Sequence, residues 1–248
     1  MRLSLCFALH LIQFNIIIEY SIHTLTSHDL SMLINAPFYK LMLLTNRQQT
    51  PLADYLQFIR TCASSGITAV QLREKKQPID YLLAFGQQLK SILDPLNIPL
   101  IVNDDIELAL ELNASGVHLG QSDGDARKAR QILGPNKMIG VSIDSEENLI
   151  SANDLPIDYV GIGAIYKTAN KHNVTTIWGI KRLQQIAAHS KHPIVGIGGI
   201  DIHNAADVVL SGAEGIAVIG ALHDTCDPSL VTQQLRNIID KGDHNHVA

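Results

Sequence analysis

From Lys40 onward the chain alternates short apolar runs with amphipathic stretches, and this alternation is the feature that most restricts its fold. The apolar runs are the length of strands, whereas the stretches between them carry apolar side chains at helical spacing. The predicted strands are residues 40–45, 68–72, 99–103, 116–119, 138–142, 158–163, 193–197 and 215–219. The predicted helices are residues 52–65, 79–93, 106–112, 125–133, 146–152, 180–188, 203–211 and 230–239.

Eight strand–helix units are the number that closes a parallel barrel, and 248 residues are a common length for one. The strands are apolar almost throughout, which is typical of strands buried on both faces. A doubly wound open sheet would produce a similar alternation, but its ligand-binding residues would gather at one switch point. Here such residues follow nearly every strand, so the sequence predicts an α/β fold with a single (β/α)8 TIM barrel and an N-terminal extension.

The predicted barrel covers residues 37–240, between an N-terminal extension of residues 1–36 and a polar C-terminal tail of residues 241–248. The first 18 residues are apolar, but polar side chains such as His10 interrupt them and no small-residue cleavage site follows. Three interpretations stay open: a helix packed on the domain, a membrane-associated leader, or an upstream start that is not used. The position of Met32 shortly before the first strand favours the third.

Charge and cysteine content narrow the class of protein. The net charge of −5 argues against nucleic-acid binding, so any recognition of phosphate must be local. Cys6, Cys62 and Cys226 are far apart in the sequence and match neither metal-ligand nor redox-pair spacing. They are typical of reduced thiols in a cytoplasmic protein. Association with a membrane is not expected. A homo-oligomer is compatible with the sequence but is not determined by it.

Polar residues and glycines follow the predicted strands. In a barrel the C-terminal strand ends form one face, so these residues are expected to converge. They are Gln71, Arg73 and Lys75 after the second strand, Asn103 and Asp104 after the third, Asp123 after the fourth, Ser142 at the end of the fifth, Lys167, Thr168, Ala169, Asn170 and Lys171 after the sixth, Gly198 and Gly199 after the seventh, and Ile219 and Gly220 at the eighth.

These residues also have purely structural interpretations. Asn103 or Asp104 could cap the helix that follows, and Asp123 could cap the helix that starts near Asp125. Paired glycines are common in tight turns, and a serine often ends a strand. His118 lies within a strand and is interpreted as a barrel-wall or core histidine.

As a set, the same residues suit a phosphorylated ligand and its metal. Two carboxylates beside a cationic loop are what Mg²⁺ with a diphosphate requires, because phosphate oxygens and water complete the ion's shell. Arg73 offers a planar fork to phosphate oxygens, and a lysine adds a compact charge. The loops after the last two strands of a barrel commonly bind a phosphate through backbone amides. The sequence therefore predicts a site for a diphosphate and a monophosphate, and it contains no obvious nucleophile for covalent catalysis.

The motifs together resemble the thiamine phosphate synthase family. The segments Q-L-R-E-K, N-D-D, G-V-H-L-G-Q-x-D, G-V-S, V-G-I-G-G-I and I-A-V-I-G occur in family order between Lys40 and Leu222. The resemblance implies a (β/α)8 barrel that joins a pyrimidine methyl diphosphate to a thiazole ethyl phosphate and releases diphosphate. It also implies that the diphosphate leaves first and that the thiazole nitrogen attacks the resulting pyrimidine cation.

The resemblance assigns roles to residues by their positions in these motifs. It implies that Asp104 and Asp123 hold Mg²⁺. The pyrimidine diphosphate would contact Gln71, Leu72, Arg73, Glu74, Lys75, Asn103, Ser142 and Lys171, among which Arg73, Lys75, Ser142 and Lys171 would be catalytic. The thiazole phosphate would lie against Thr168, Ala169, Asn170, Gly199, Ile219 and Gly220.

Two departures from the family pattern affect the thiazole side. The sixth loop reads K-T-A-N-K where the family often has P-T-x-T-K, and Gly220 replaces a frequent serine. Binding of the thiazole phosphate is therefore expected with altered geometry. Two alternative functions remain: a thiazole tautomerase, which would need no metal or diphosphate site, and a non-catalytic barrel that binds thiamine phosphates.

Overall fold

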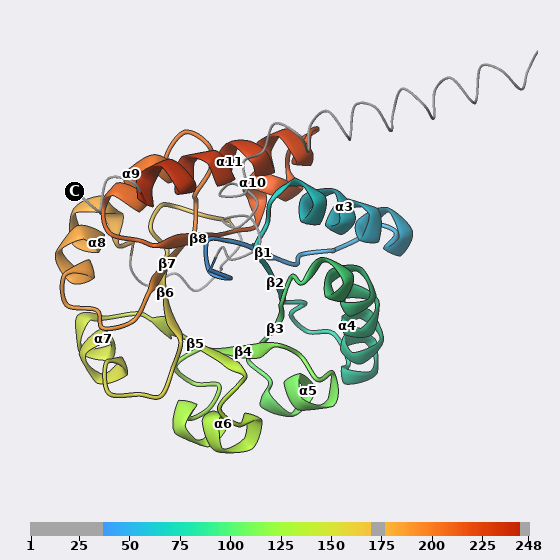
Figure 1. Ribbon diagram of the computed structural model, residues 1–248, viewed down its shortest axis with the longest axis horizontal. Coiled ribbons are helices and arrows are strands. Elements are labelled where there is room, and N and C mark those ends of the chain that lie inside the picture. The colour runs from blue at the N-terminus through green and yellow to red at the C-terminus, as the bar shows by residue number, and fades with distance from the viewer. Residues whose placement is uncertain (1–36, 170–176, 244–248) are drawn as a thin grey trace, which may run out of the picture. The chain divides into compact units, whose positions relative to one another are not determined.

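Eight parallel strands close into a barrel in chain order, and β8 pairs with β1 to complete it (Figure 1). In this computed structural model the described residues are 37–169 and 177–243. The strands are β1 (Leu41–Leu44), β2 (Ala69–Leu72), β3 (Leu100–Asn103), β4 (Gly116–Leu119), β5 (Met138–Ile143), β6 (Tyr159–Gly163), β7 (Ile194–Ile197) and β8 (Gly215–Val218). The predicted TIM barrel is confirmed, and the open-sheet alternative is wrong.

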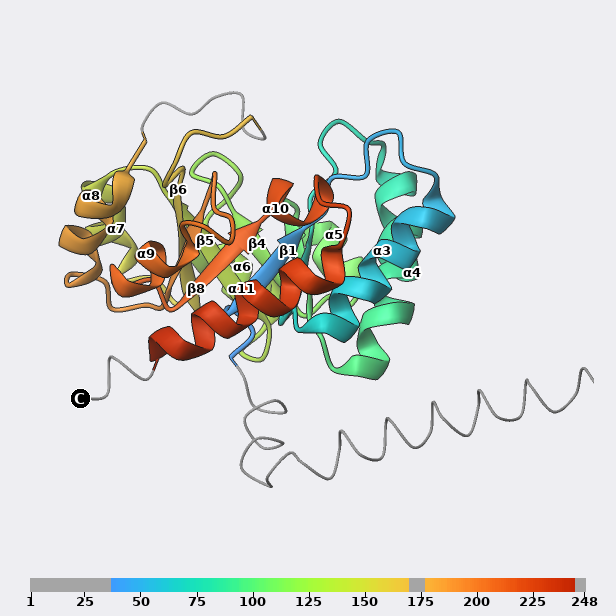
Figure 2. The same cartoon turned by 90° about the horizontal axis from the view of Figure 1, so that it is seen from above.

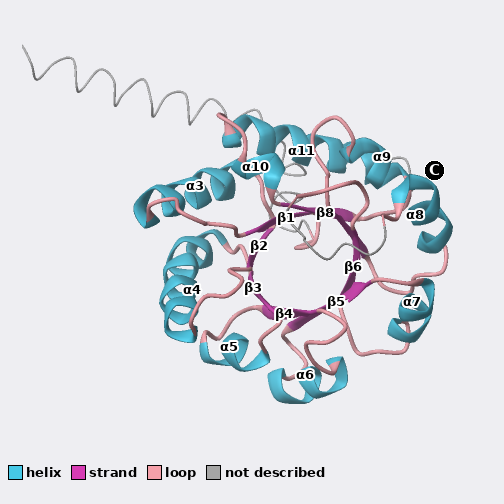
Figure 3. Ribbon diagram, turned by 180° about the vertical axis from the view of Figure 1, so that it is seen from behind, coloured by secondary structure: helices cyan, strands magenta, loops and turns pink. Residues whose placement is uncertain are grey.

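Helices alternate with the strands and surround the barrel, as the cyan ribbons of Figure 3 show. They are α3 (Leu52–Ser65), α4 (Ile79–Leu93), the short 3₁₀ helix η1 (Asp94–Leu96), α5 (Ile106–Glu111), α6 (Ala126–Leu133), α7 (Glu146–Ala152), α8 (Gly179–Ala187), α9 (Ala205–Leu210), α10 (Gly220–His223) and α11 (Pro228–Asp243). The sequence did not predict α10. It placed the end of α11 at residue 239, whereas the helix continues into the predicted tail as far as Asp243.

Alternation along each strand divides the apolar side chains into two cores. Val70 and Leu72 of β2 belong to the large core between the strands and the helices. A smaller cluster fills the barrel itself and consists of Met42, Leu44, Ala69, Ile101, Tyr159, Val195 and Ala217. Because the strands are buried on both faces, they read as continuous apolar runs in the sequence.

Side-chain caps fix where two of the helices begin. Asp105 accepts a hydrogen bond from the Leu108 amide at 2.8 Å and caps α5. Asp125 accepts one from the Arg127 amide at 2.7 Å and caps α6. The capping alternative for Asp104 and Asp123 is therefore wrong, because Asp105 and Asp125 are the N-cap residues of these two helices.

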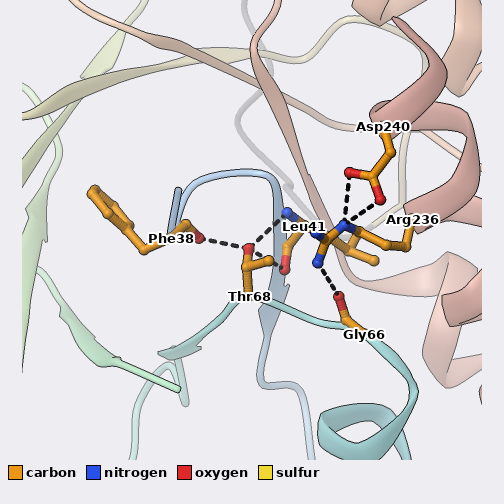
Figure 4. Close-up of polar contacts among 6 residues, drawn as sticks. All are labelled: Phe38, Leu41, Gly66, Thr68, Arg236 and Asp240. Atoms are coloured by element: carbon orange, nitrogen blue, oxygen red, sulfur yellow. Dashed lines mark hydrogen bonds and ion pairs between the residues drawn. The ribbon is translucent and has the colours of Figure 1, made fainter. Parts of the chain in front are cut away.

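Two sets of polar contacts lie where β1, β2 and α11 come together (Figure 4). The hydroxyl of Thr68 donates to the Phe38 carbonyl at 2.7 Å and accepts from the Leu41 amide at 2.8 Å. Arg236 of α11 pairs with Asp240 one turn later, at 2.9 Å, and donates to the carbonyl of Gly66, the C-cap residue after α3, at 3.3 Å. The last helix thus holds the first strand–helix unit in place.

The chain divides at Pro37 into two units, and the barrel lies in the second, which begins at Phe38. The interpretations of residues 1–36 fall outside the described residues. Cys62 is buried and Cys226 is exposed, and both are free thiols. Within the described part of the chain, no helix combines the length and apolar character needed to cross a membrane.

Candidate active site

A cavity of about 660 Å³ opens at the C-terminal ends of the strands. These ends and the loops that follow them lie at one end of the barrel in the side view of Figure 2. Residues at or near the C-terminal end of each strand from β2 to β8 converge on the cavity, as expected for this fold. The predicted site residues that line it are Gln71, Arg73, Lys75, Asn103, Asp104, Asp123, Ser142, Thr168, Ala169, Gly199, Ile219 and Gly220.

Two predicted contacts point elsewhere. Leu72 is 2% exposed and packs in the core between strands and helices. The Glu74 carboxylate accepts a hydrogen bond from the Arg47 amide at 2.9 Å, so it braces the β1–α3 loop. Both line a smaller neighbouring pocket but not the main cavity. Asn170 and Lys171 lie outside the described residues, so their roles stay predictions.

Two aspartates form the acidic side of the cavity. Asp104 has the left-handed backbone φ of 69° and accepts a hydrogen bond from Lys75 Nζ at 2.8 Å. Asp123 accepts from the Gly120 amide at 3.0 Å and from the Ser122 hydroxyl at 3.2 Å. Burial raises the pKa of Asp123, and so do a hydrogen bond and charge repulsion from Asp104. The two carboxylates are therefore close neighbours, although they follow different strands.

This pair fits a hard divalent cation. Among residues 37–169 and 177–243 there is no group of three histidine, cysteine or acidic side chains that could hold a metal by itself. An ion bound by two carboxylates keeps most of its coordination shell for water and phosphate oxygens, which is how Mg²⁺ usually binds beside phosphorylated substrates. The two carboxylates thus suit an Mg²⁺ ion whose coordination shell is completed by the diphosphate of a ligand.

Arg73 is held at the edge of the acidic side through its backbone. Its amide donates to the hydroxyl of the fully buried Thr45 at 2.8 Å. Burial lowers the pKa of Arg73, while the charges of Asp104 and Glu74 raise it. An arginine remains protonated under these conditions, so the cavity keeps a fixed, partly desolvated positive charge there.

Glycines shape the opposite side of the cavity. Gly198 and Gly199 follow β7 with φ values of 96° and 68°, which side chains rarely adopt. A Cβ at Gly199 would lie 2.6 Å from the Lys167 carbonyl oxygen. The Asn204 side chain donates to the Gly199 carbonyl at 2.9 Å and holds this turn. Together with Ile219 and Gly220 after β8, the turn presents bare main chain to the cavity.

Two further residues line the cavity, and the sequence predicted a role in the site for neither. His118, which was expected to be a barrel-wall or core histidine, lies in the cavity wall with Nε2 3.0 Å from the Ser142 hydroxyl. Its Nδ1 lies 2.9 Å from the hydroxyl of Tyr159. Burial raises the pKa of Tyr159, although a hydrogen bond from Gln71 acts in the opposite direction. Successive side chains of a strand point to opposite faces, so His118 shares a face of β4 with Gly116. This alternation could have placed His118 on the interior face of the barrel.

Comparisons with known proteins agree with the geometry. A sequence model of the family described as thiamine monophosphate synthase matches residues 41–222. The thiamine-phosphate synthase of Chlamydia caviae is 53% identical over 205 residues, which cover 83% of this chain and 97% of that protein. The thiamine-phosphate synthase of Vibrio campbellii is 40% identical over 201 residues, which cover 81% of this chain and 98% of that protein.

A solved structure extends the likeness from sequence to fold. The thiamine phosphate pyrophosphorylase of Pyrococcus furiosus matches with a TM-score of 0.74 and 32% identity, covering 83% of this chain and 97% of that one. The family match spans most of the barrel, and the relatives align over nearly their whole length. The chain therefore belongs to the thiamine-phosphate synthase family.

Proposed function

We propose that this cavity joins 4-amino-2-methyl-5-(diphosphooxymethyl)pyrimidine to thiazole ethyl phosphate and releases thiamine phosphate and diphosphate. One observation carries the proposal: a single barrel mouth gathers a carboxylate pair and cations on one side and glycine turns on the other. Asp104, Asp123, Arg73 and Lys75 supply the first group, and the turns at 198–199 and 219–220 supply the second. The two sides suit a metal-bound diphosphate and a monophosphate.

Asp104 and Asp123 are the residues that would hold Mg²⁺. When bound there, the ion would neutralise negative charge on the departing diphosphate. Arg73 and Lys75 would bind the same group from the β2 side, Arg73 as a planar fork and Lys75 as a mobile point charge. These cations favour the state in which the leaving group carries its full charge, so they lower the barrier to its departure.

The reaction needs no nucleophile from the protein. The bond between the pyrimidine methylene carbon and the diphosphate oxygen breaks, and its electron pair leaves with the diphosphate. The ring amino group stabilises the methylene cation. The thiazole nitrogen then donates its lone pair and forms the new carbon–nitrogen bond. The protein's part is to position both rings and to exclude water, which would otherwise capture the cation.

Neutral polar side chains on the inner wall would orient the pyrimidine. Gln71 is 3% exposed, and its amide lies 3.6 Å from the Met42 sulfur, a weak partner, besides its hydrogen bond to Tyr159. Ser142 contacts His118, so both are held in place on neighbouring strands. We assign Gln71, Asn103 and Ser142 to the pyrimidine ring and its methyl diphosphate.

On the other side, the thiazole phosphate would lie against the main chain of Gly199 and Gly220 and beside Thr168 and Ala169. A phosphate can approach a glycine amide closely because no Cβ intervenes. The serine common in the family at position 220 would add a hydroxyl, whereas Gly220 leaves the backbone amide alone. Substrate binding here therefore depends mainly on how the two turns are oriented.

Assaying diphosphate release with both substrates and Mg²⁺ tests the proposal. Release that requires the thiazole phosphate supports a synthase. Isomerisation of the thiazole alone would support a tautomerase, and binding without turnover would support a non-catalytic barrel. Running the assay on chains that start at Met1 and at Met32 also tests whether the N-terminal extension contributes.

Adjacent lysines offer a matched test of the diphosphate side. Lys75 lines the main cavity, whereas Lys76 lines only the small pocket beside it. Lys75→Met should weaken binding of inorganic diphosphate with Mg²⁺ by about tenfold, the size of one charge-assisted contact. Lys76→Met should leave it unchanged, and equal effects in calorimetry would contradict the assignment.

We place this activity in the cytoplasm, consistent with the free thiols of Cys62 and Cys226.

A further inference from the structure

A chain of hydrogen bonds connects the turn after β8 to the loop after β1. His223 ends α10, and its Nδ1 lies 2.8 Å from the Ile219 carbonyl oxygen. Its Nε2 lies 2.8 Å from the hydroxyl of Tyr55 in α3. The Tyr55 oxygen in turn accepts a hydrogen bond from the Asn46 amide at 2.9 Å. The mechanism above uses neither ring, and neither lines the cavity.

The partners determine the direction of each hydrogen bond. A carbonyl oxygen can only accept, so His223 Nδ1 carries the proton and Nε2 of the neutral ring is left as an acceptor. The Tyr55 hydroxyl donates to that nitrogen. Burial lowers the pKa of His223, which favours the neutral ring, although hydrogen bonding to Ile219 and the charge of Asp224 raise it. Tyr55 is 2% exposed, so bulk water does not compete with His223 for its hydroxyl.

The carbonyl that His223 holds belongs to the peptide group of the proposed phosphate turn. The Ile219 oxygen also accepts from the amides of Leu222 and His223, both at 3.1 Å. The peptide between Ile219 and Gly220 is planar, so its carbonyl and its N–H point in opposite directions. Directing the carbonyl into the α10 turn therefore directs the Gly220 N–H the other way. Gly220 lines the cavity, and no hydroxyl at this position can substitute for a misdirected amide.

The far end of the chain reaches the diphosphate side. The β1–α3 loop that contains Asn46 also includes Thr45 and Arg47, which pair with the backbone of Arg73 and the carboxylate of Glu74, respectively. The same loop thus supports both anion sites without lining the cavity itself.

We propose that His223 is a positioning residue that aims the Gly220 amide at the thiazole phosphate. Tyr55 fixes the tautomer of the His223 ring. This inference rests on the proposed function of the turn.

Three variants separate positioning from general support of the fold. In His223→Asn the side-chain amide takes the place of Nδ1 and can still donate to Ile219. In His223→Gln the amide extends to the Nε2 position near Tyr55 and loses the contact with the turn. His189 provides the control, because its Nδ1 makes the same contact, at 3.0 Å, with the Gln185 carbonyl four residues earlier at the end of α8. His189→Gln removes a bond of the same kind at an exposed position away from the cavity.

The experiment measures kcat, the KM of each substrate, and the affinity for inorganic phosphate with diphosphate and Mg²⁺ present to occupy the other anion site. We expect His223→Gln to raise the KM for thiazole phosphate and the Kd for phosphate about tenfold, the size of one lost hydrogen bond. The KM for the pyrimidine diphosphate should stay unchanged, and His223→Asn should restore most of the affinity.

Two results would overturn the inference. One is a His223→Gln protein that behaves like His189→Gln, and the other is equal weakening of both substrates in the Asn and Gln variants. Thermal unfolding of each variant separates these outcomes from simple loss of structure. If the unmodified chain releases no diphosphate with both substrates, the proposed function fails instead, while the phosphate affinities still report on the turn.

Discussion

Replacing Asp104 with asparagine should remove activity while leaving the fold almost unchanged. Asparagine tolerates the left-handed φ of 69° at this position, whereas alanine would add backbone strain. The substitution also breaks the ion pair with Lys75, but the Lys75 and Asp104 side chains are 56% and 30% exposed. Such a pair contributes at most about 1 kcal/mol. The free energy of unfolding should therefore change by less than about 1 kcal/mol.

Turnover should respond much more strongly. Removing one group that stabilises developing charge typically lowers kcat by about 10²–10³-fold, and Asp104 would also supply half of the protein's metal ligands. We expect a loss of at least this size in Asp104→Asn and in Asp104→Ala. Diphosphate release at saturating concentrations of both substrates, measured across a Mg²⁺ series, gives the turnover, and urea unfolding gives the stability.

The neighbouring residue provides the opposite outcome. Asp105 caps α5, and its alanine variant should lose about 1 kcal/mol of stability, as is usual for an N-cap, with turnover preserved. Near-normal turnover of Asp104→Asn at limiting Mg²⁺ would refute the role of Asp104. A turnover loss in Asp105→Ala equal to that in Asp104→Asn would show that helix placement, and not metal binding, controls the rate.

Three further predictions concern the support of the site. Glu74→Gln should weaken the acceptor of the Arg47 amide and lower the unfolding free energy by about 0.5–1.5 kcal/mol in urea, and an unchanged value would contradict the bracing role. The free energy of unfolding should fall as pH drops below about 6.5, because His223 protonates in the unfolded chain at a higher pH than in the folded one. Unfolding midpoints measured from pH 5 to 8 should depend less steeply on pH in His223→Asn than in the unmodified chain. Gly140→Ala should cost about 1–3 kcal/mol, since its Cβ would lie 2.1 Å from the Tyr159 ring, and native-like thermal stability would refute this packing.

The sequence predicted most of the secondary structure because each element carries its own periodicity. The bounds of α3, α4, β4 and α7 agree with those read from the sequence, and most other ends differ by one or two residues. The helix α10 was missed because four residues are too few for helical periodicity. The end of α11 was placed too early because the polar residues after Ile239 resemble a tail.

The candidate site was predictable where polar residues end a strand. Asp104 and Asp123 stood out for this reason, and the structure brings their carboxylates together. Leu72 and Glu74 were included because they lie in the same motif as Arg73, yet the alternation of the strand and the bracing of the loop direct both away from the cavity. Sequence adjacency does not distinguish a side chain that faces a ligand from one that supports its neighbour.

The sequence by itself determined the class of fold and the chemical types of group at its rim, because apolar periodicity and strand-end residues are local properties. Only the tertiary structure decided which side chains meet. The pairing of β4 with β5 places His118 against Ser142, and closure of the barrel between β1 and β8 joins His223 to Tyr55 across 168 positions of the chain. Contacts of this kind depend on register, strand tilt and packing, which arise from the whole barrel and leave no pattern in any one segment.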